Sequence, residues 1–218
     1  MKKGIILITC LCVSVYLHAQ FESGSFSIQA GFDGAIHGTY AESKFNGAVI
    51  DHDSSAAATS MFASSIQYHI LPWLSAGLGF DYGAYIEDPE DAEANGNRIS
   101  TFCVDARVYA VNHEHFNLYF GVQGGATFLK IDRLYVLFPP VSSEFMYHYS
   151  GSHFGAFTGF NWYLFKQVGL FTQIHYSNHG FDLKRYTING TEQDLGQSEV
   201  TLDTFGVGIR LGLAIAFF

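Results

Sequence analysis

The last fourteen residues of the chain alternate strictly between large apolar and small side chains. The large set is Phe205, Val207, Ile209, Leu211, Leu213, Ile215 and Phe217. The small set is Gly206, Gly208, Gly212, Ala214 and Ala216, with a single charge at Arg210. Because successive side chains of a β-strand point to opposite faces, this segment predicts a strand with one face against lipid and the other against a narrow polar interior.

The first nineteen residues have the pattern of an export signal. Two lysines precede an apolar run over residues 4–17, and Ala19 supplies the small residue that a signal peptidase needs. We therefore expect a signal peptide at residues 1–19 and one mature domain at residues 20–218.

The amino-acid composition limits the functions and folds that are possible for the mature chain. The formal net charge of the full sequence is −9, and there is no basic stripe, which disfavours nucleic-acid binding because that affinity comes mainly from phosphate neutralisation. Cys103 is the only cysteine outside the expected signal, so the mature fold is expected to be stable without an internal disulfide. No mature segment has the roughly 18 apolar residues of a transmembrane helix.

Eight segments carry the period-two alternation of half-buried strands. They lie at about 26–36, 59–70, 74–84, 102–109, 118–128, 153–164, 168–176 and 205–218. Short turns at 72–73, 112–116 and 165–167 alternate with long connections near 41–58, 87–98, 130–148 and 178–199. This alternation predicts an all-β fold, an eight-stranded antiparallel up-and-down transmembrane β-barrel with both termini on the periplasmic side.

Over residues 21–218 the periodicity, turn pattern and chain ends resemble the OmpA/OmpX-like family of small outer-membrane β-barrels. The C-terminal segment is also similar to the C-terminal signal strand of such barrels, with Phe218 one position out of phase. The resemblance implies a location in the bacterial outer membrane, contact with outer-membrane lipid and lipopolysaccharide, and a monomer. It also implies that any extracellular ligand or protein is bound through the loops.

Charged residues recur at the inward positions of the predicted strands. They are Asp33, Asp81, Asp105, Arg107 and Arg210. One interpretation is a packed polar lumen in which carboxylates and guanidiniums pair, because an unpaired buried charge is costly. The other is a pore or a proton path. Eight strands leave an interior only wide enough for side chains, which favours the packed lumen.

The predicted loops contain metal-capable groups and an apolar segment. The acidic stretch 87–93 has enough carboxylates to bind calcium but lacks the spacing of an EF-hand, so we expect a solvated loop. Residues 51–53 and 113–115 also carry side chains that can bind a metal, but we expect them to be solvated turn residues. We therefore expect no metal and no cofactor. The apolar, aromatic segment 134–149 predicts either a partner-binding surface or strands that extend beyond the bilayer over the barrel mouth.

A four-residue stretch, His175-Tyr-Ser-Asn178, is similar to the His-x-Ser-Asn motif of the PagL-like lipid A deacylases. The resemblance implies His175 as general base, Ser177 as nucleophile and Asn178 as oxyanion donor. Glu199, and after it Asp203, is the best-placed acid. Strand parity, however, places His175 and Ser177 inside and Glu199 outside, whereas an enzyme acting on a bilayer lipid needs them together on the outer wall unless a β-bulge intervenes.

These observations predict an outer-membrane barrel with a structural, adhesive or interaction role carried by its extracellular loops, and no catalysis. The alternative is a lipid A ester hydrolase with a Ser-His-acid triad. A third reading, a transporter of small hydrophobic molecules, requires a lateral opening in the barrel wall.

Overall fold

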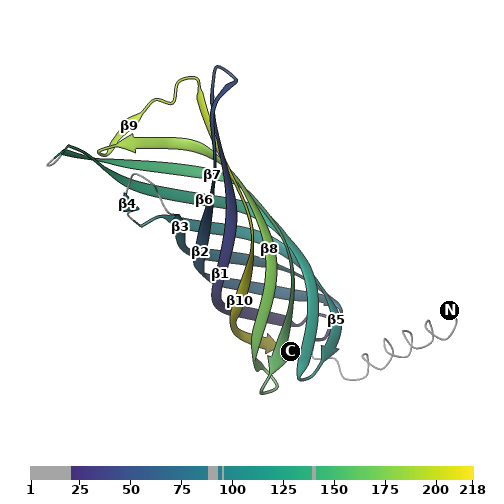
Figure 1. Ribbon diagram of the computed structural model, residues 1–218. Helices are drawn as coiled ribbons and strands as arrows, with labels where there is room; N and C mark the ends of the chain where they lie inside the picture. The colour runs from purple at the N-terminus through teal and green to yellow at the C-terminus, as the bar shows by residue number, and fades with distance from the viewer. Residues whose placement is uncertain (1–20, 88–92, 95, 139–140) are drawn as a thin grey trace.

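The computed structural model describes residues 21–87, 93–94, 96–138 and 141–218 (Figure 1). The expected signal peptide lies outside these residues. The strands are β1 Phe26–Phe45, β2 Ala48–Leu71, β3 Leu74–Glu87, β4 Glu93–Ala94, β5 Arg98–His113, β6 Phe116–Phe138, β7 Val141–Tyr163, β8 Val168–Ile188, β9 Thr191–Gln193 and β10 Ser198–Phe217. No helix in the described part of the chain is long and apolar enough to span a membrane.

The sheet closes into a ring of eight strands. Each long strand pairs antiparallel with the next one along the chain, in the order β1, β2, β3, β5, β6, β7, β8 and β10. Strand β10 pairs with β8 on one side and with β1 on the other, which joins the two ends of the sheet. The short strands β4 and β9 add to β6 and β8. The predicted all-β, eight-stranded, up-and-down barrel is therefore confirmed.

The wall of the barrel alternates between apolar outward and polar inward side chains. Phe32 is 74% exposed and its neighbour Asp33 only 2%. The same alternation runs along β5, β8 and β10. The exposed outward side chains include Ile36, Phe62, Leu78, Val104, Phe120, Phe154, Ile174 and Ile209, which together encircle the barrel. A continuous apolar belt of this size matches a hydrocarbon environment, so the fold is a transmembrane β-barrel.

The two ends of the barrel differ. Three short connections, after Leu71, His113 and Tyr163, gather at one end together with Phe21 and the C-terminus, and we call this the turn end (Figure 1). At the opposite end the strands continue beyond the belt. The described pairing of β2 with β3 ends at Ala57, and that of β8 with β10 ends at Asp182. We call the strands beyond these points the extension.

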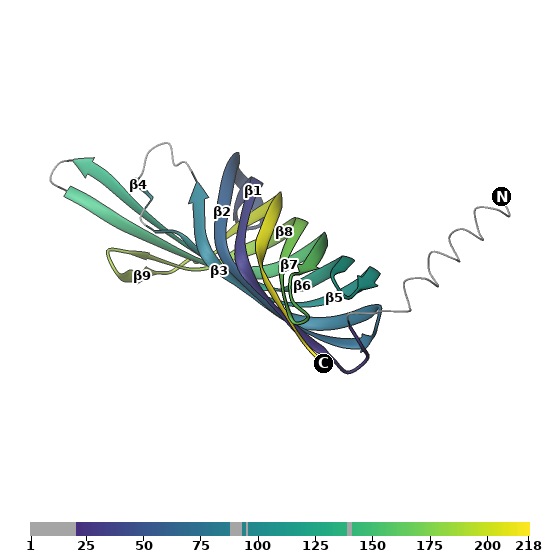
Figure 2. The same ribbon diagram turned by 90° about the horizontal axis from the view of Figure 1, so that it is seen from below.

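The extension corrects the prediction of long loops. Most of residues 41–58, 130–148 and 178–199 form strand rather than loop. Strands β1 and β2 rise as one hairpin, while the ends of β6, β7 and β8 with β9 lean away from it as an arm (Figures 1 and 2). These strands were missed because neither face is buried by the barrel, so their sequences lack the apolar alternation.

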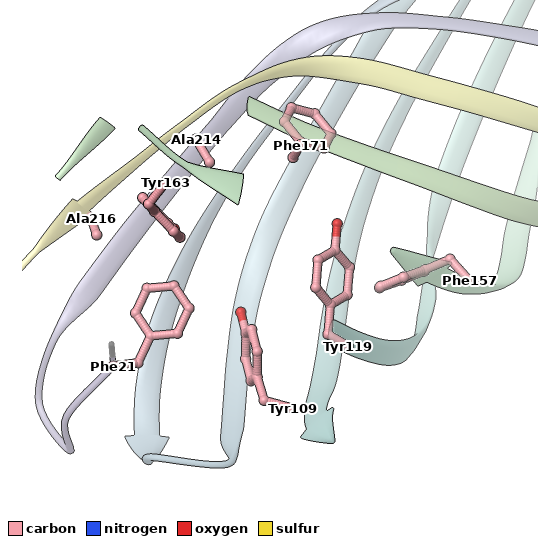
Figure 3. Packing of buried hydrophobic residues seen from close by; sticks show 8 residues of the cluster. All are labelled: Phe21, Tyr109, Tyr119, Phe157, Tyr163, Phe171, Ala214 and Ala216. Carbon is pink, nitrogen blue, oxygen red and sulfur yellow. The ribbon is translucent and has the colours of Figure 1, made fainter. Parts of the chain in front are cut away.

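The interior is layered. At the turn end an aromatic cluster fills the barrel (Figure 3), consisting of Phe21, Tyr109, Tyr119, Phe157, Tyr163, Phe171, Ala214 and Ala216. At the other end a second apolar cluster contains Ala57, Met61, Tyr85, Ile99, Leu129, Ile131, Phe181 and Leu202. Polar and charged side chains occupy the space between the two clusters.

Small residues make room for these side chains. Gly31 on β1 faces Gly212 on β10 across the closing seam. A Cβ on Gly212 would collide with the backbone of Gly31 and with the ring of Phe171. The glycines on the inward face of β10 therefore allow the aromatic cluster to pack inside a ring of only eight strands.

Candidate functional site

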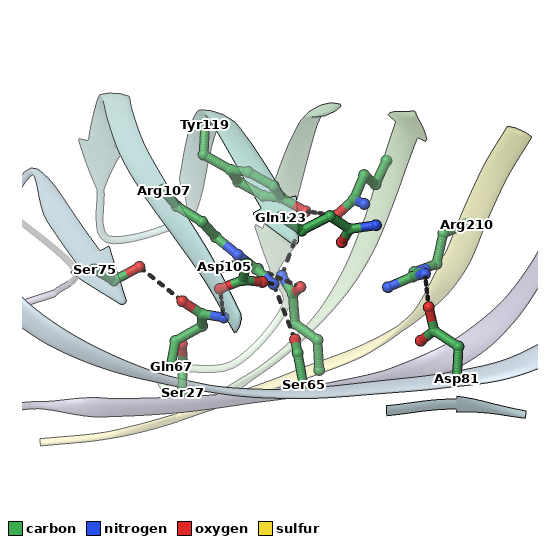
Figure 4. Close-up of polar contacts among 12 residues, drawn as sticks. Ser27, Ser65, Gln67, Ser75, Asp81, Asp105, Arg107, Tyr119, Gln123 and Arg210 are labelled. Atoms are coloured by element: carbon green, nitrogen blue, oxygen red, sulfur yellow. Dashed lines mark hydrogen bonds and ion pairs between the residues drawn. The ribbon is translucent and has the colours of Figure 1, made fainter. Parts of the chain in front are cut away.

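The side of the polar lumen nearer the turn end centres on Arg107 (Figure 4). Its Nη1 donates to Oε1 of Gln29 at 2.5 Å. Its Nη2 donates to Oγ of Ser65 and to Oδ2 of Asp105, both at 2.9 Å. The guanidinium carbon also lies 5.2 Å from the ring centre of Tyr119. This buried cation thus contacts a carboxylate, two neutral acceptors and an aromatic face.

Amides extend this network across the lumen. Gln67 donates to Oδ1 of Asp105 at 2.5 Å and accepts from Ser75 at 3.0 Å. Gln29 donates to Asn161 on the far strand β7 at 2.8 Å. The contacts connect β1, β2, β3, β5 and β7, so the network cross-links most of the barrel from inside.

A second network centres on Arg210, the single charge of the C-terminal strand. Its Nε and Nη2 donate to Oδ2 of Asp33 at 3.1 and 2.8 Å. Nη2 also donates to Oδ2 of Asp81 at 2.7 Å (Figure 4). Nε2 of His175 approaches the other oxygen of Asp33 at 3.7 Å. One guanidinium therefore bridges carboxylates from β1 and β3.

The structure brings the five predicted lumen residues together in these two groups. Asp33, Asp81, Asp105, Arg107 and Arg210 are all buried. Arg107 pairs with Asp105, and Arg210 pairs with Asp33 and Asp81. Their low water accessibility means that side chains fill the barrel at this level, as the interior diameter of eight strands requires.

Histidines lie between these networks and the second apolar cluster. The ring centres of His153 and His179 are 4.4 Å apart, and those of His37 and His179 are 6.1 Å apart. His37 contacts Oγ1 of Thr59 at 3.0 Å, and His153 contacts Nε2 of Gln123 at 2.8 Å. Strand parity alone could have identified His37 and His179, since each has the parity of an inward position on its strand. The described residues contain no group of three His, Cys, Asp or Glu arranged to hold a metal.

The residues of the alternative triad are divided between the two sides of the wall. His175 and Ser177 are buried and face the lumen. Asn178 and Glu199 are exposed. Glu199 lies opposite Lys44 in the extension. The register of β8 with β7 and with β10 runs from Gly169 through Asn178 without a shift, so this part of the strand keeps its parity.

The other loop residues lie in the extension or at the turn end. Glu87 pairs with Arg133 on β6 at 2.8 Å, while residues 88–92 of the acidic stretch lie outside the described residues. Residues 51–53 are exposed on β2. His113 and His115 flank a turn, with ring centres 6.3 Å apart.

The described residues of the apolar segment, 134–138 and 141–149, form strand. They contribute the ends of β6 and β7 to the arm, so these strands extend beyond the apolar belt, while packing over the barrel mouth stays a prediction. Tyr147 on β7 stacks on Tyr186 on β8, with ring centres 6.0 Å apart. Tyr149 packs against the second apolar cluster. Tyr147 and Tyr149 thus join the arm to the barrel.

Comparison with known proteins identifies the fold. No protein-family model and no curated protein sequence matches the chain. Among solved structures, the outer membrane protein OprG from Pseudomonas aeruginosa is similar at a TM-score of 0.62 and 14% identity, over 91% of this chain and 99% of that one. The outer membrane protein AlkL, solved in lipid bilayers, is similar at a TM-score of 0.54 and 13% identity, over 90% of this chain and 92% of that one. The chain therefore has the fold of the small outer-membrane β-barrels.

Proposed function

We propose that this protein is an outer-membrane β-barrel with an interaction or adhesive role carried by the extension, and that the barrel itself is a filled structural support. The expected signal peptide, the apolar belt and the fold support a location in the bacterial outer membrane. In this proposal the turn end with both termini faces the periplasm, and the extension faces the outside of the cell.

The observation that carries the proposal is the contrast between the lumen and the extension. The lumen holds two buried ion-pair networks between apolar clusters, which leaves little room for transported solutes. The extension instead places long paired strands beyond the belt, where they contribute nothing to crossing a membrane. Exposed structure of this kind on a rigid barrel supports a role in recognition.

The tip of the β1–β2 hairpin supports a binding role most directly. Asn46 and Gly47 have φ angles of 52° and 76°, the pair of positive angles that a tight hairpin turn requires. The residues that flank this turn are apolar and exposed, with Phe45 at 49%, Val49 at 52% and Ile50 at 65%. Apolar side chains at the far end of a hairpin, outside any lipid, form a contact patch that a partner can cover.

The proposal is tested with cells that express the wild-type chain or a variant with Phe45→Ser, Val49→Ser and Ile50→Ser. We expect the wild type to increase attachment between cells, or to immobilised matrix protein or polysaccharide, and the variant to lose that increase. A control with Ser54→Ala and Ser55→Ala changes polar positions on the same hairpin and should attach like the wild type. Attachment equal to that of cells with empty vector would contradict the proposal.

Conductance of the purified barrel in a planar bilayer separates this role from transport of solutes. We expect no stepwise conductance, because the lumen side chains are buried and paired. Regular conductance steps would instead support a pore.

A further inference from the structure

Basic side chains lie directly opposite one another across four adjacent strands. Arg98 on β5 pairs in register with Lys130 on β6. Lys130 pairs with His148 on β7, and His148 with Arg185 on β8. Neighbouring strands are about 4.8 Å apart, so the four residues form a continuous row, which we call the basic row. The row is on the outer wall, because Lys130 has the parity of the exposed Phe128.

The basic row concentrates positive charge in an acidic chain. Nine Lys and Arg residues follow residue 20, and three of them stand in the row. A fourth, Lys184, adjoins Arg185 at the register shift between β7 and β8, where both are exposed. Arg98 and Lys130 are like charges directly opposite each other, and such a pair destabilises a sheet. Such an arrangement favours a bound anion.

Carboxylates neutralise part of this charge. Lys130 forms an ion pair with Asp132 at 2.9 Å, and Lys184 forms one with Asp182 at 3.0 Å. In each case the acid lies two positions away on the same strand and is at the edge of the basic row. The Lys184–Asp182 pair is exposed on both sides, so it contributes little energy and can be opened by a stronger ligand, whereas Asp132 of the other pair is buried.

The two guanidiniums have other partners. Arg98 donates to the hydroxyl of Tyr82 at 2.8 Å, and Nη2 of Arg185 lies 3.5 Å from Nε2 of His148. Neither has a carboxylate partner among the residues that the structure describes. Burial, reinforced by the charges of Arg185 and Lys130, lowers the pKa of His148, so its imidazole is a neutral acceptor at pH 7. Arg98 and Arg185 thus retain donors for a ligand at either end of the row.

Arg98, Lys130 and His148 of the basic row line a pocket of about 370 Å³ on the outer wall, and Arg185 adjoins it as the chain neighbour of the lining residue Lys184. Arg98, Lys130 and Lys184 contribute its cationic side. Tyr82 and Phe128 contribute its apolar side, one row nearer to the apolar belt. The pocket therefore combines cations with exposed aromatic rings at the edge of the apolar belt that faces the extension.

We propose that this pocket binds the phosphorylated sugar headgroup of an outer-leaflet glycolipid of the lipid A class. The inference rests on the outer-membrane location and orientation proposed above. Guanidinium groups bind phosphate through paired N–H donors, and Lys130 and Lys184 add charge between them. Tyr82 and Phe128 lie where they would contact the sugar and the first carbons of the acyl chains. Free phosphate would use only the cationic half of the pocket.

Lipid retention by the mature chain folded in zwitterionic detergent micelles tests the site. Native mass spectrometry would compare lipid A carrying two phosphates, the same lipid after removal of both phosphates, and inorganic phosphate as a competitor. We expect affinity for the phosphorylated lipid to exceed that for the dephosphorylated lipid by about tenfold or more, because charge-assisted hydrogen bonds are lost. Inorganic phosphate at equal concentration should not displace the lipid.

Matched variants locate the binding. Arg98→Gln with Arg185→Gln should weaken retention of phosphorylated lipid A by about tenfold or more, since both guanidiniums available to the phosphate are lost. Lys44→Gln with Lys166→Gln removes the same charge from the hairpin tip and the turn end and should leave retention unchanged. Heat-modifiable gel migration identifies folded protein in each case, and the row variant should be at least as stable as the wild type because like charges are removed.

Three results would overturn the site. They are equal retention of the two lipids, an equal loss of lipid retention in both variant pairs, and displacement of the lipid by inorganic phosphate at equal concentration. The measurement is made in micelles and leaves Phe45, Val49 and Ile50 unchanged, so its outcome is independent of the attachment assay. Failure of the attachment role and failure of the lipid site are therefore distinguishable.

Discussion

Arg210 on β10 and Asp33 on β1 face each other across the two strands that close the barrel, 177 positions apart in the sequence. Two N–H groups of the guanidinium donate to one carboxylate oxygen, at 3.1 and 2.8 Å. Both side chains are buried, so the pair links the two ends of the sheet in a place that water does not reach. Removal of Arg210 leaves the buried carboxylates of Asp33 and Asp81 without their counter-ion.

The first prediction concerns this closing pair. Arg210→Ala leaves Asp33 and Asp81 uncompensated and should lower the free energy of unfolding by about 3–5 kcal/mol, the range for a broken buried ion pair. Denaturant unfolding of the barrel in micelles measures the change. Arg185→Ala, on the exposed outer wall, is the control and should shift stability by no more than about 0.5 kcal/mol. Equal midpoints for Arg210→Ala and wild type would refute the structural role of the pair.

The second prediction concerns Arg107 and Asp105, which contact each other at 2.9 Å. Arg107→Met and Asp105→Leu should each destabilise the barrel by about 3 kcal/mol or more, because each leaves a buried charge unpaired. The double variant should be much less unstable than the sum of the two, since no charge then remains. A double-mutant cycle gives this coupling, and strictly additive effects would argue against the pair.

The third prediction concerns Phe21, which is fully buried at the turn end. Its ring stacks on His69 with centres 3.8 Å apart, and its backbone N–H donates to Asn112 at 3.1 Å. Phe21→Ala should destabilise the barrel by about 3 kcal/mol through the cavity left in the aromatic cluster. Phe165→Ala, in an exposed turn of the same end, should have a far smaller effect. A smaller loss of stability for Phe21→Ala than for Phe165→Ala would mean that Phe21 does not stabilise the aromatic cluster.

The sequence was most informative where one face of a strand meets lipid and the other meets the lumen. The alternation around Phe32 and Asp33, and along the last fourteen residues, predicted the ring, the belt and the direction of each inward charge. Parity also placed Arg107 beside Asp105, because residues two apart on a strand point the same way.

Other contacts depend on register between strands that are distant in the sequence. Nothing in the local pattern shows that Arg210 meets Asp81 as well as Asp33, or that Arg98, Lys130 and Arg185 share one row. The extension was missed for a related reason, because strands with two exposed faces have no apolar periodicity.

The fourth prediction separates scaffold from enzyme. His175 and Ser177 face the lumen, whereas Glu199 lies exposed in the extension. We therefore expect mass spectra of lipid A to be the same from cells that express wild type, the Ser177→Ala variant or no protein. A species that lacks an ester-linked acyl chain with wild type, and not with Ser177→Ala, would establish the lipid A hydrolase instead.

The most direct test of the account is labelling of intact cells with a bulky maleimide that does not cross the outer membrane. Ile50→Cys places a thiol on the exposed hairpin of the extension, and Phe165→Cys places one at the turn end, while the native Cys103 is buried in the wall. The account predicts that the Ile50→Cys variant is labelled on intact cells and the Phe165→Cys variant only after the outer membrane is permeabilised. The reverse order, or recovery of folded protein in the soluble periplasm, would contradict an outer-membrane barrel that presents its extension to the outside.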